Sequence, residues 1–261
     1  MGNNTLDWLA GSETWTLTLG TELKRLGHEI QAYSPQLGFI AMQMEALGIK
    51  CVSELKKQST GAFKFQLALQ DSEGFEPDII ICSHNQITKD LHAAFPNTPI
   101  IAVVHGIIHK DPETSQMWPE HPVTEFKVDQ YVAVSQEVQA LLKEVYGIES
   151  VIITNFFDLE KFKWSPIPPT MDRIMRKPLS FLVNSNYLDR ESNEVQIIKA
   201  VADHYDAQLK AIGQNFTGSW DLQDVIKNTD VVVGMGRSVL EGFVMGKIAL
   251  VHGRWGTGGV L

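Results

Sequence analysis

The chain has 261 residues, of which 44% are hydrophobic and 20% are charged, and its formal net charge at pH 7 is −9. This composition is typical of a folded globular protein and excludes the disordered, fibrous and disulfide-scaffold classes. The negative charge argues against nucleic acid as a partner and against general affinity for anionic lipid, because both attract net basic surfaces.

The sequence predicts a cytoplasmic protein. It contains no run of the roughly 20 apolar residues that a membrane-spanning helix needs, and its first residues lack the basic segment and apolar run of a secretory signal. Cys51 and Cys82 fall in apolar, strand-like runs, which favours buried, reduced thiols. A weak peripheral membrane contact stays open, as an alternative to a solvated surface, for the basic residues near mid-chain: Lys161, Lys163, Arg173, Arg176 and Lys177.

Short apolar runs alternate with amphipathic stretches along the first half of the chain, which is the pattern of βαβ units around a parallel sheet. Trp15, Leu19, Leu23 and Leu26 recur at helical spacing, and Gly27 ends that helix. Strands are expected at 29–33, 50–53, 78–83, 99–105, 131–135 and 151–155, and further helices at 36–47, 119–127 and 136–146.

Residues 165–178 break the alternation with four prolines and no periodicity, which indicates an interdomain linker. The alternation then resumes, with strands expected at 179–184, 208–213, 230–233 and 248–252 and helices at 191–205, 220–228 and 238–246. We therefore predict an α/β fold of two Rossmann-like, doubly wound domains, 1–164 and 179–261. Ligands of such sheets bind beyond the carboxyl ends of the strands, so the loops there are the candidate sites.

The segment after the strand 230–233 has the residues of a phosphate site. Gly234 and Gly236 let a ligand approach the backbone, and the helix that follows offers unpaired N–H groups at its start. Arg237 adds a bidentate donor for phosphate oxygens, whereas Ser238 either joins the loop or caps the helix. Glu241 lies one turn into the helix, where its carboxylate can accept hydrogen bonds from the two vicinal hydroxyls of a ribose. A tight turn alone would explain the glycines, but with the arginine and the glutamate in register a nucleotide diphosphate is the better prediction.

Three loops of the first half are further candidates. Gly11 and Ser12 form a flexible turn at a helix start, suited to phosphates or to an acceptor, and Glu13 also complements the helix dipole. His105 ends the apolar strand 99–105, where sites form, although a lone histidine is commonly structural. His84 follows the strand 78–83 in the same way.

No metal site is predicted. His105 and His109 have the spacing of a metal-binding pair on a helix. However, Gly106 and its β-branched neighbours disfavour a helix there, and no third ligand is evident. Asp189 and Asp230 are isolated, so no acidic cluster is placed to hold a cation.

The segment around Glu241 resembles family 4 glycosyltransferases, which carry E-x7-E in the phrase E-G-F-G-L-x-x-L-E-A-M-A-x-G-x-P. The chain matches the glycines of this phrase, its Leu-Glu pair at Leu240 and Glu241, and its closing glycine at Gly246. Val233 stands where the family has the first glutamate. The resemblance implies ribose binding by Glu241 and leaves the role of the first glutamate without a counterpart.

The resemblance extends through the first half of the chain. The family's opening G-G-x-E loop matches residues 10–13, with alanine for the first glycine, and its strand histidine matches His105. The phrases v-x-v-S and N-G-V-D match residues 131–135 and 155–158, with Phe156 in place of the glycine.

This resemblance implies the GT-B architecture, in which two Rossmann-like domains face each other across a cleft; here the second domain is shortened and the chain is short at both ends. It implies a retaining, metal-independent glycosyltransferase that moves a sugar from a nucleotide sugar to the hydroxyl of a carbohydrate or lipid-linked acceptor, with no cofactor. His105 and Glu241 would be the catalytic residues, His105 contacting the donor sugar. The expected donor-binding residues are Gly11, Ser12, Gly234, Gly236, Arg237, Ser238 and Glu241, with Glu13, His84 and Arg190 as weaker candidates.

Departures from the family pattern leave an alternative open. Tyr187 and Ser192 occupy the positions of the family's Arg and Lys, which grip the diphosphate, and Arg190 or Arg237 would have to supply that charge. The alternative is a catalytically impaired GT-B relative that binds a nucleotide sugar or a partner subunit. A dinucleotide-dependent oxidoreductase is disfavoured, because no G-x-G-x-x-G follows an early strand.

Overall fold

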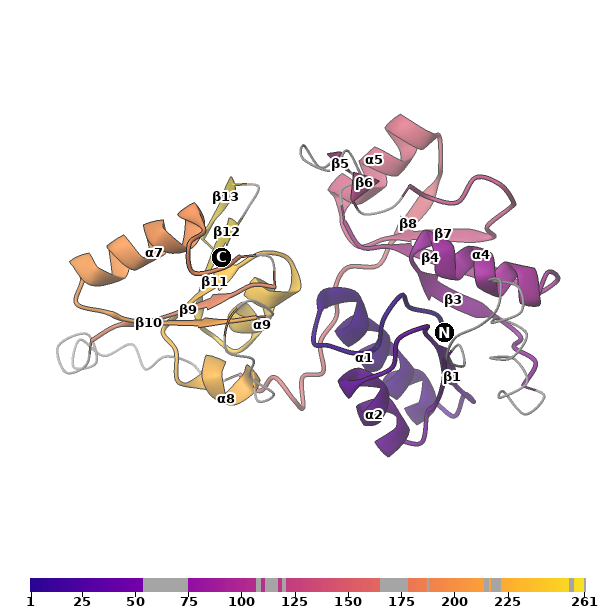
Figure 1. Ribbon diagram of the computed structural model, residues 1–261, viewed down its shortest axis with the longest axis horizontal. Helices are drawn as coiled ribbons and strands as arrows, with labels where there is room; N and C mark the ends of the chain where they lie inside the picture. The colour runs from indigo at the N-terminus through magenta and orange to yellow at the C-terminus, as the bar shows by residue number, and fades with distance from the viewer. Residues whose placement is uncertain are drawn as a thin grey trace. The chain divides into compact units, whose positions relative to one another are not determined.

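The structure is a computed structural model that describes residues 1–53, 75–106, 109–110, 117–118, 121–164, 178–186, 188–213, 216, 222–253 and 256–260. The chain divides into two compact units, Met1–Phe156 and Phe157–Leu261, and each is built mainly of parallel strands covered by helices (Figure 1). The predicted domain limits at 164 and 179 stay a prediction, because 165–177 lie outside the described residues.

The first unit is built on parallel strands. Four strands pair side by side in the order β3 (Ile80–Ser83), β4 (Ile100–Val104), β7 (Gln130–Ala133) and β8 (Ser150–Ile152). A second parallel pair consists of β1 (Gln31–Tyr33) and β2 (Lys50–Val52). All six coincide with or lie close to strands that the apolar runs predict.

Residues 1–3 join these two groups of strands. Gly2 forms parallel bridges with Tyr33 of β1 and with Cys82 of β3, so it occupies the place of a central strand. A Cβ on Gly2 would lie 2.5 Å from Cδ1 of Leu91, which packs against it from a helix. The order of the sheet reverses here, because the chain passes from the centre outward through β1 and β2 and then returns to β3. Such a reversal is where ligands of doubly wound sheets bind.

Helices cover both faces of the first unit. In its described residues the helices are α1 (Gly11–Arg25), α2 (Phe39–Ala46), α4 (Asn85–Ala94) and α5 (Gln136–Tyr146). Trp15 of α1 and Leu142 of α5 share a buried cluster with Val103 and Val132, whereas Leu91 of α4 belongs to another cluster with β1–β4 residues. Side chains on both faces of this sheet are therefore buried against helices.

One predicted helix of this unit is wrong. Residues 121–127, the described part of the helix expected at 119–127, form an irregular segment. Pro122 has no N–H to give to a helix and restricts the residue before it to extended conformations. The segment is fixed instead by the Tyr131 hydroxyl, which donates to the Val123 carbonyl at 2.7 Å. The short antiparallel pair β5 (His109–Lys110) and β6 (Met117–Trp118) was also not predicted.

The second unit has a five-stranded sheet. Its strands lie in the order β10 (Gln208–Ile212), β9 (Ser180–Asn184), β11 (Val231–Gly234), β12 (Ile248–Gly253) and β13 (Gly256–Val260). The first four are parallel and match the predicted strands, whereas β13 runs antiparallel to β12 and was not predicted. Strand order reverses between β9 and β11, so the carboxyl ends of these two strands form the switch point.

Helices again cover both faces. They are α7 (Asn193–His204), α8 (Leu222–Lys227) and α9 (Arg237–Val244). Val183 and Val233 face a cluster that contains α7 residues, while Leu182 and Val232 face a cluster with Ile226 of α8. Two sheets with helices on both faces agree with the predicted pair of doubly wound units.

Candidate functional site

The predicted phosphate loop lies at the switch point of the second unit. Gly234 ends β11 in register with Asn184 of β9. A Cβ on Gly234 would lie 2.8 Å from the carbonyl oxygen of Asn184, so only glycine fits without a shift. Gly236 has φ 58° and ψ −128° at the start of α9, a conformation that favours glycine. The two glycines bring the backbone into the turn that the sequence predicts.

Glu241 and Arg237 form an ion pair inside this site. Arg237 Nε donates to Glu241 Oε1 at 2.9 Å, and the two side chains are 9% and 6% exposed. The guanidinium of Arg237 also lies 4.9 Å from the ring centroid of Phe157, a cation–π contact. Burial raises the pKa of Glu241 to about 7, against the opposing effect of Arg237 and Lys161. The sequence predicted both residues of the pair as ligand contacts but not their contact with each other.

Ser238 and Arg190 of this unit were also predicted to bind the donor. Ser238 does not cap α9, because Gly236 holds that position and the Ser238 hydroxyl donates to the Met235 carbonyl at 2.8 Å. Arg190 is exposed in the turn before α7, where its carbonyl accepts a hydrogen bond from Gln196. Tyr187 lies outside the described residues. Ligand contacts by Ser238 and Arg190 stay predictions.

In the first unit, α1 and β3 bring three predicted residues together. The Ser12 hydroxyl donates to Glu13 Oε2 at 2.9 Å, and His84 Nε2 lies 3.4 Å from Ser12 Oγ. Glu13 is buried, which raises the pKa of its carboxyl group. His84 has φ 86° and ψ 136°, a strained conformation for a residue with a side chain. Gly11 begins α1 beside them.

His105 lies just beyond the carboxyl end of β4 in the same unit. Its Nε2 is 2.9 Å from Ser83 Oγ, and its ring makes an edge contact with Trp15 at 5.3 Å between centroids. Burial, with a smaller effect of the neighbouring His84, lowers the pKa of His105 to about 3. The imidazole is therefore neutral near pH 7. Sequence reasoning missed Ser83 and Trp15, although Ser83 ends a predicted strand, where site residues collect.

We expect acid to destabilise the chain through His105. Its pKa is about 3 in the folded chain against 6.5 ordinarily, so between these values the unfolded chain binds the extra proton. The free energy of unfolding therefore falls as the pH falls, by about 1.4 kcal/mol per pH unit. His105→Gln should remove this contribution, as urea unfolding of both proteins at several pH values would measure. Equal pH slopes for the variant and the wild type would contradict it.

The described residues were also compared with the requirements of a metal site and of a membrane-spanning helix. Within the described ranges, no group of three or more His, Cys, Asp or Glu side chains is placed to hold a metal ion. No helix among those residues is long and apolar enough to cross a membrane. His109 lies in β5, and its side chain is outside the described part.

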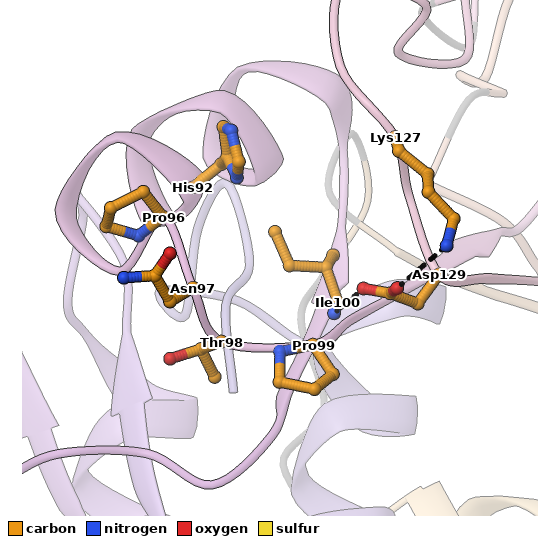
Figure 2. Close-up of a pocket in the computed structure, with 8 residues that line it drawn as sticks. All are labelled: His92, Pro96, Asn97, Thr98, Pro99, Ile100, Lys127 and Asp129. Carbon is orange, nitrogen blue, oxygen red and sulfur yellow. Dashed lines mark hydrogen bonds and ion pairs between the residues drawn. The ribbon is translucent and has the colours of Figure 1, made fainter.

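A pocket of about 270 Å³ lies at the amino ends of β4 and β7, at the opposite edge of the sheet from His105 (Figure 2). Its acidic residue, Asp129, accepts a hydrogen bond from the Ile100 N–H at 2.9 Å and lies 3.6 Å from Lys127 Nζ. Asp129 and Lys127 therefore interact with other groups of the chain. Because the pocket lies at the amino ends of the strands and His105 at the carboxyl end, the pocket is not part of the candidate site.

Solved structures establish the fold. A glycosyltransferase from Rickettsia africae ESF-5 matches with a TM-score of 0.66 and 15% identity over 95% of this chain and 77% of that one. Anabaena Alr3699/HepE, solved in complex with UDP-glucose, matches with a TM-score of 0.67 and 15% identity over 94% of this chain and 78% of that one. Sucrose-phosphate synthase from Thermosynechococcus elongatus matches with a TM-score of 0.55 and 12% identity over 91% of this chain and 74% of that one. The predicted GT-B fold is confirmed.

The family follows from the sequence comparison. No curated protein matches the chain. The family model described as Glycosyltransferase Family 4 matches residues 9–161, which is more than half of the chain. This match contains Gly11 and Ser12 at the start of α1, together with His84 and His105. The chain therefore belongs to glycosyltransferase family 4.

Proposed function

We propose that this chain transfers a sugar from a nucleotide sugar to an acceptor hydroxyl, with retention of configuration and without a metal ion. The observation that carries the proposal is the arrangement at the switch point of the second unit. A glycine turn there leads into α9, and Glu241 lies one turn into that helix beside Arg237. Backbone N–H groups at a helix start bind phosphate, and a carboxylate accepts hydrogen bonds from ribose hydroxyls.

The donor diphosphate would bind at the Gly234–Ser238 loop, with positive charge from Arg237 and the helix dipole. Arg237 already binds Glu241, so in this proposal its guanidinium serves both the carboxylate and the diphosphate. An arginine has five N–H donors, which is enough for two anionic partners. HepE, crystallised with UDP-glucose, supports a nucleotide sugar as the ligand class.

The first unit would contact the transferred sugar and the acceptor. In a retaining transfer, the bond from the anomeric carbon to the diphosphate breaks and the acceptor oxygen bonds to the same face. The acceptor proton passes to the departing phosphate. His105, neutral because burial lowers its pKa, would hydrogen-bond the sugar without placing a positive charge beside the oxocarbenium-like transition state. We propose a carbohydrate or lipid-linked compound as the acceptor.

Two observations favour the alternative, an impaired GT-B relative. Val233, at the position of the family's first glutamate, is 1% exposed in the core of β11. Ser192, at the family's lysine position, binds Asp189: its hydroxyl lies 3.0 Å from Asp189 Oδ1. Two groups that would act on the donor are therefore replaced by residues with structural roles.

The proposal is tested by mixing the purified protein with a panel of nucleotide sugars. Thermal stability and the release of free nucleoside diphosphate are followed together. We expect one donor to raise the melting temperature and to be hydrolysed slowly, and we expect faster release of nucleoside diphosphate, by transfer of the sugar, once the acceptor is added. Binding without release, with varied acceptors, would favour the impaired relative. No binding would overturn the transferase and would leave, of the alternative, only a relative that binds a partner subunit.

A further inference from the structure

Ser83 is the one hydrogen-bonding partner of the His105 ring among the described residues. Its hydroxyl oxygen lies 2.9 Å from His105 Nε2. Ser83 is 1% exposed, and its backbone N–H donates to the Gly2 carbonyl at 3.0 Å, which fixes the end of β3. The His105 ring also makes an edge contact with Trp15, which is 3% exposed. The ring is therefore held in place by buried groups of two different elements.

The direction of this hydrogen bond determines which nitrogen of His105 carries the proton. A neutral imidazole has one N–H and one lone pair. If Nε2 donated to Ser83, the serine O–H would be a buried donor without an acceptor among the described residues. An unsatisfied buried donor costs about 1–3 kcal/mol. If the serine donates to Nε2, its O–H has an acceptor and the ring proton lies on Nδ1, which is not among the buried atoms without a partner in the described residues.

We propose that Ser83 is a positioning residue whose hydroxyl donates to Nε2 and thereby fixes His105 in the tautomer with its proton on Nδ1. Within the described residues Nδ1 has no other partner, so it is the nitrogen left for a ligand. The ring then presents an N–H donor, which binds a hydroxyl or phosphate oxygen and cannot act as a base. This catalytic consequence rests on the proposed function, whereas the tautomer itself does not.

The tautomer is read directly from ¹⁵N chemical shifts of the histidine ring in uniformly labelled protein near neutral pH. His105→Gln assigns the signals by their loss. In the wild type we expect a protonated Nδ1 and an unprotonated Nε2. Ser83→Ala should move the population toward the Nε2–H form, which the free ring prefers, while Ser83→Thr should keep the wild-type tautomer. If the threonine does not fit, Ser83→Cys supplies a weaker donor and should give an intermediate result.

The matched control is Ser34→Ala, which removes another fully buried serine hydroxyl of the same unit, one that binds the Gln36 carbonyl. It should leave the His105 shifts unchanged. An Nε2–H tautomer in the wild type, or identical shifts in wild type and Ser83→Ala, would overturn the proposal.

Kinetics separate this role from a structural one. With the donor found in the panel, Ser83→Ala should lower kcat roughly tenfold, the value of one hydrogen bond, with little change in the donor KM. Ser83→Thr should restore kcat. A wild type that turns over no donor would refute the proposed function, while the ring shifts would still decide the role of Ser83. Equal kcat in Ser83→Ala and wild type would show that the tautomer has no catalytic effect.

Discussion

Replacing Glu241 with glutamine should weaken donor binding by roughly a hundredfold. In the proposed complex the carboxylate accepts hydrogen bonds from two ribose hydroxyls. Hydrogen bonds to a charged group contribute about 1.5–3 kcal/mol each, so losing the charge costs about 3 kcal/mol in all. Glutamine keeps an oxygen that can accept from Arg237, whose Nε lies 2.9 Å from Glu241 Oε1. Isothermal titration with the donor measures the loss.

The pH dependence distinguishes a ligand contact from general damage. Burial raises the pKa of Glu241 to about 7, so the carboxylate forms as the pH rises through this value. Donor affinity of the wild type should therefore fall as the pH falls below about 7, and Glu241→Gln should lack this step. Glu191→Gln, an exposed glutamate of the same unit, is the matched control and should bind like the wild type. A glutamine variant with undiminished affinity would exclude ribose binding by Glu241.

Replacing Gly213 with alanine should destabilise the second unit by several kcal/mol. Gly213 follows β10 with φ 142°, and a Cβ there would lie 1.8 Å from the carbonyl oxygen of Ser185. The clash involves backbone, so the ends of β9 and β10 must separate, which opposes the hydrogen bond from Ser185 N to the Ile212 carbonyl at 3.0 Å. An alanine held at this positive φ would add about 1–3 kcal/mol of backbone strain to the loss of stability. Urea unfolding of the variant measures the loss.

The control for this variant separates steric overlap from backbone strain. Gly147 has φ 64°, but a Cβ there would have nothing within 4 Å. Gly147→Ala should therefore cost only about 1–2 kcal/mol, the penalty of the left-handed conformation. If Gly213→Ala lowers the free energy of unfolding no more than Gly147→Ala does, the close approach of β9 and β10 is not important for stability.

Elements with strong local signals were predicted well from the sequence. The helix expected at 136–146 is α5, because Ser135 caps its first turn and Gly147 ends it in the left-handed conformation. Elements that depend on distant partners were missed. Gly2 joins the sheet only through isolated bridges to β1 and β3, and β13 has little apolar pattern and exists through its pairing with β12.

The candidate site shows the same division. The carboxyl ends of apolar strands pointed to His84 and His105, and the family motif pointed to Glu241. The contact of Ser83 with His105 joins neighbouring strands, so sequence spacing gives no sign of it. The Arg237–Glu241 pair has i,i+4 spacing on α9 and could have been predicted from that alone.

The junction at Gly2 lies beside a core that the two groups of strands share. Tyr33 of β1 and Val52 of β2 belong to the same buried cluster as Ile80 and Cys82 of β3. Protein regions open as separate subglobal units where they have separate cores, and these strands do not. A thermal fluctuation that loosens β1 and β2 therefore also disturbs the apolar packing of β3, the strand that ends at Ser83.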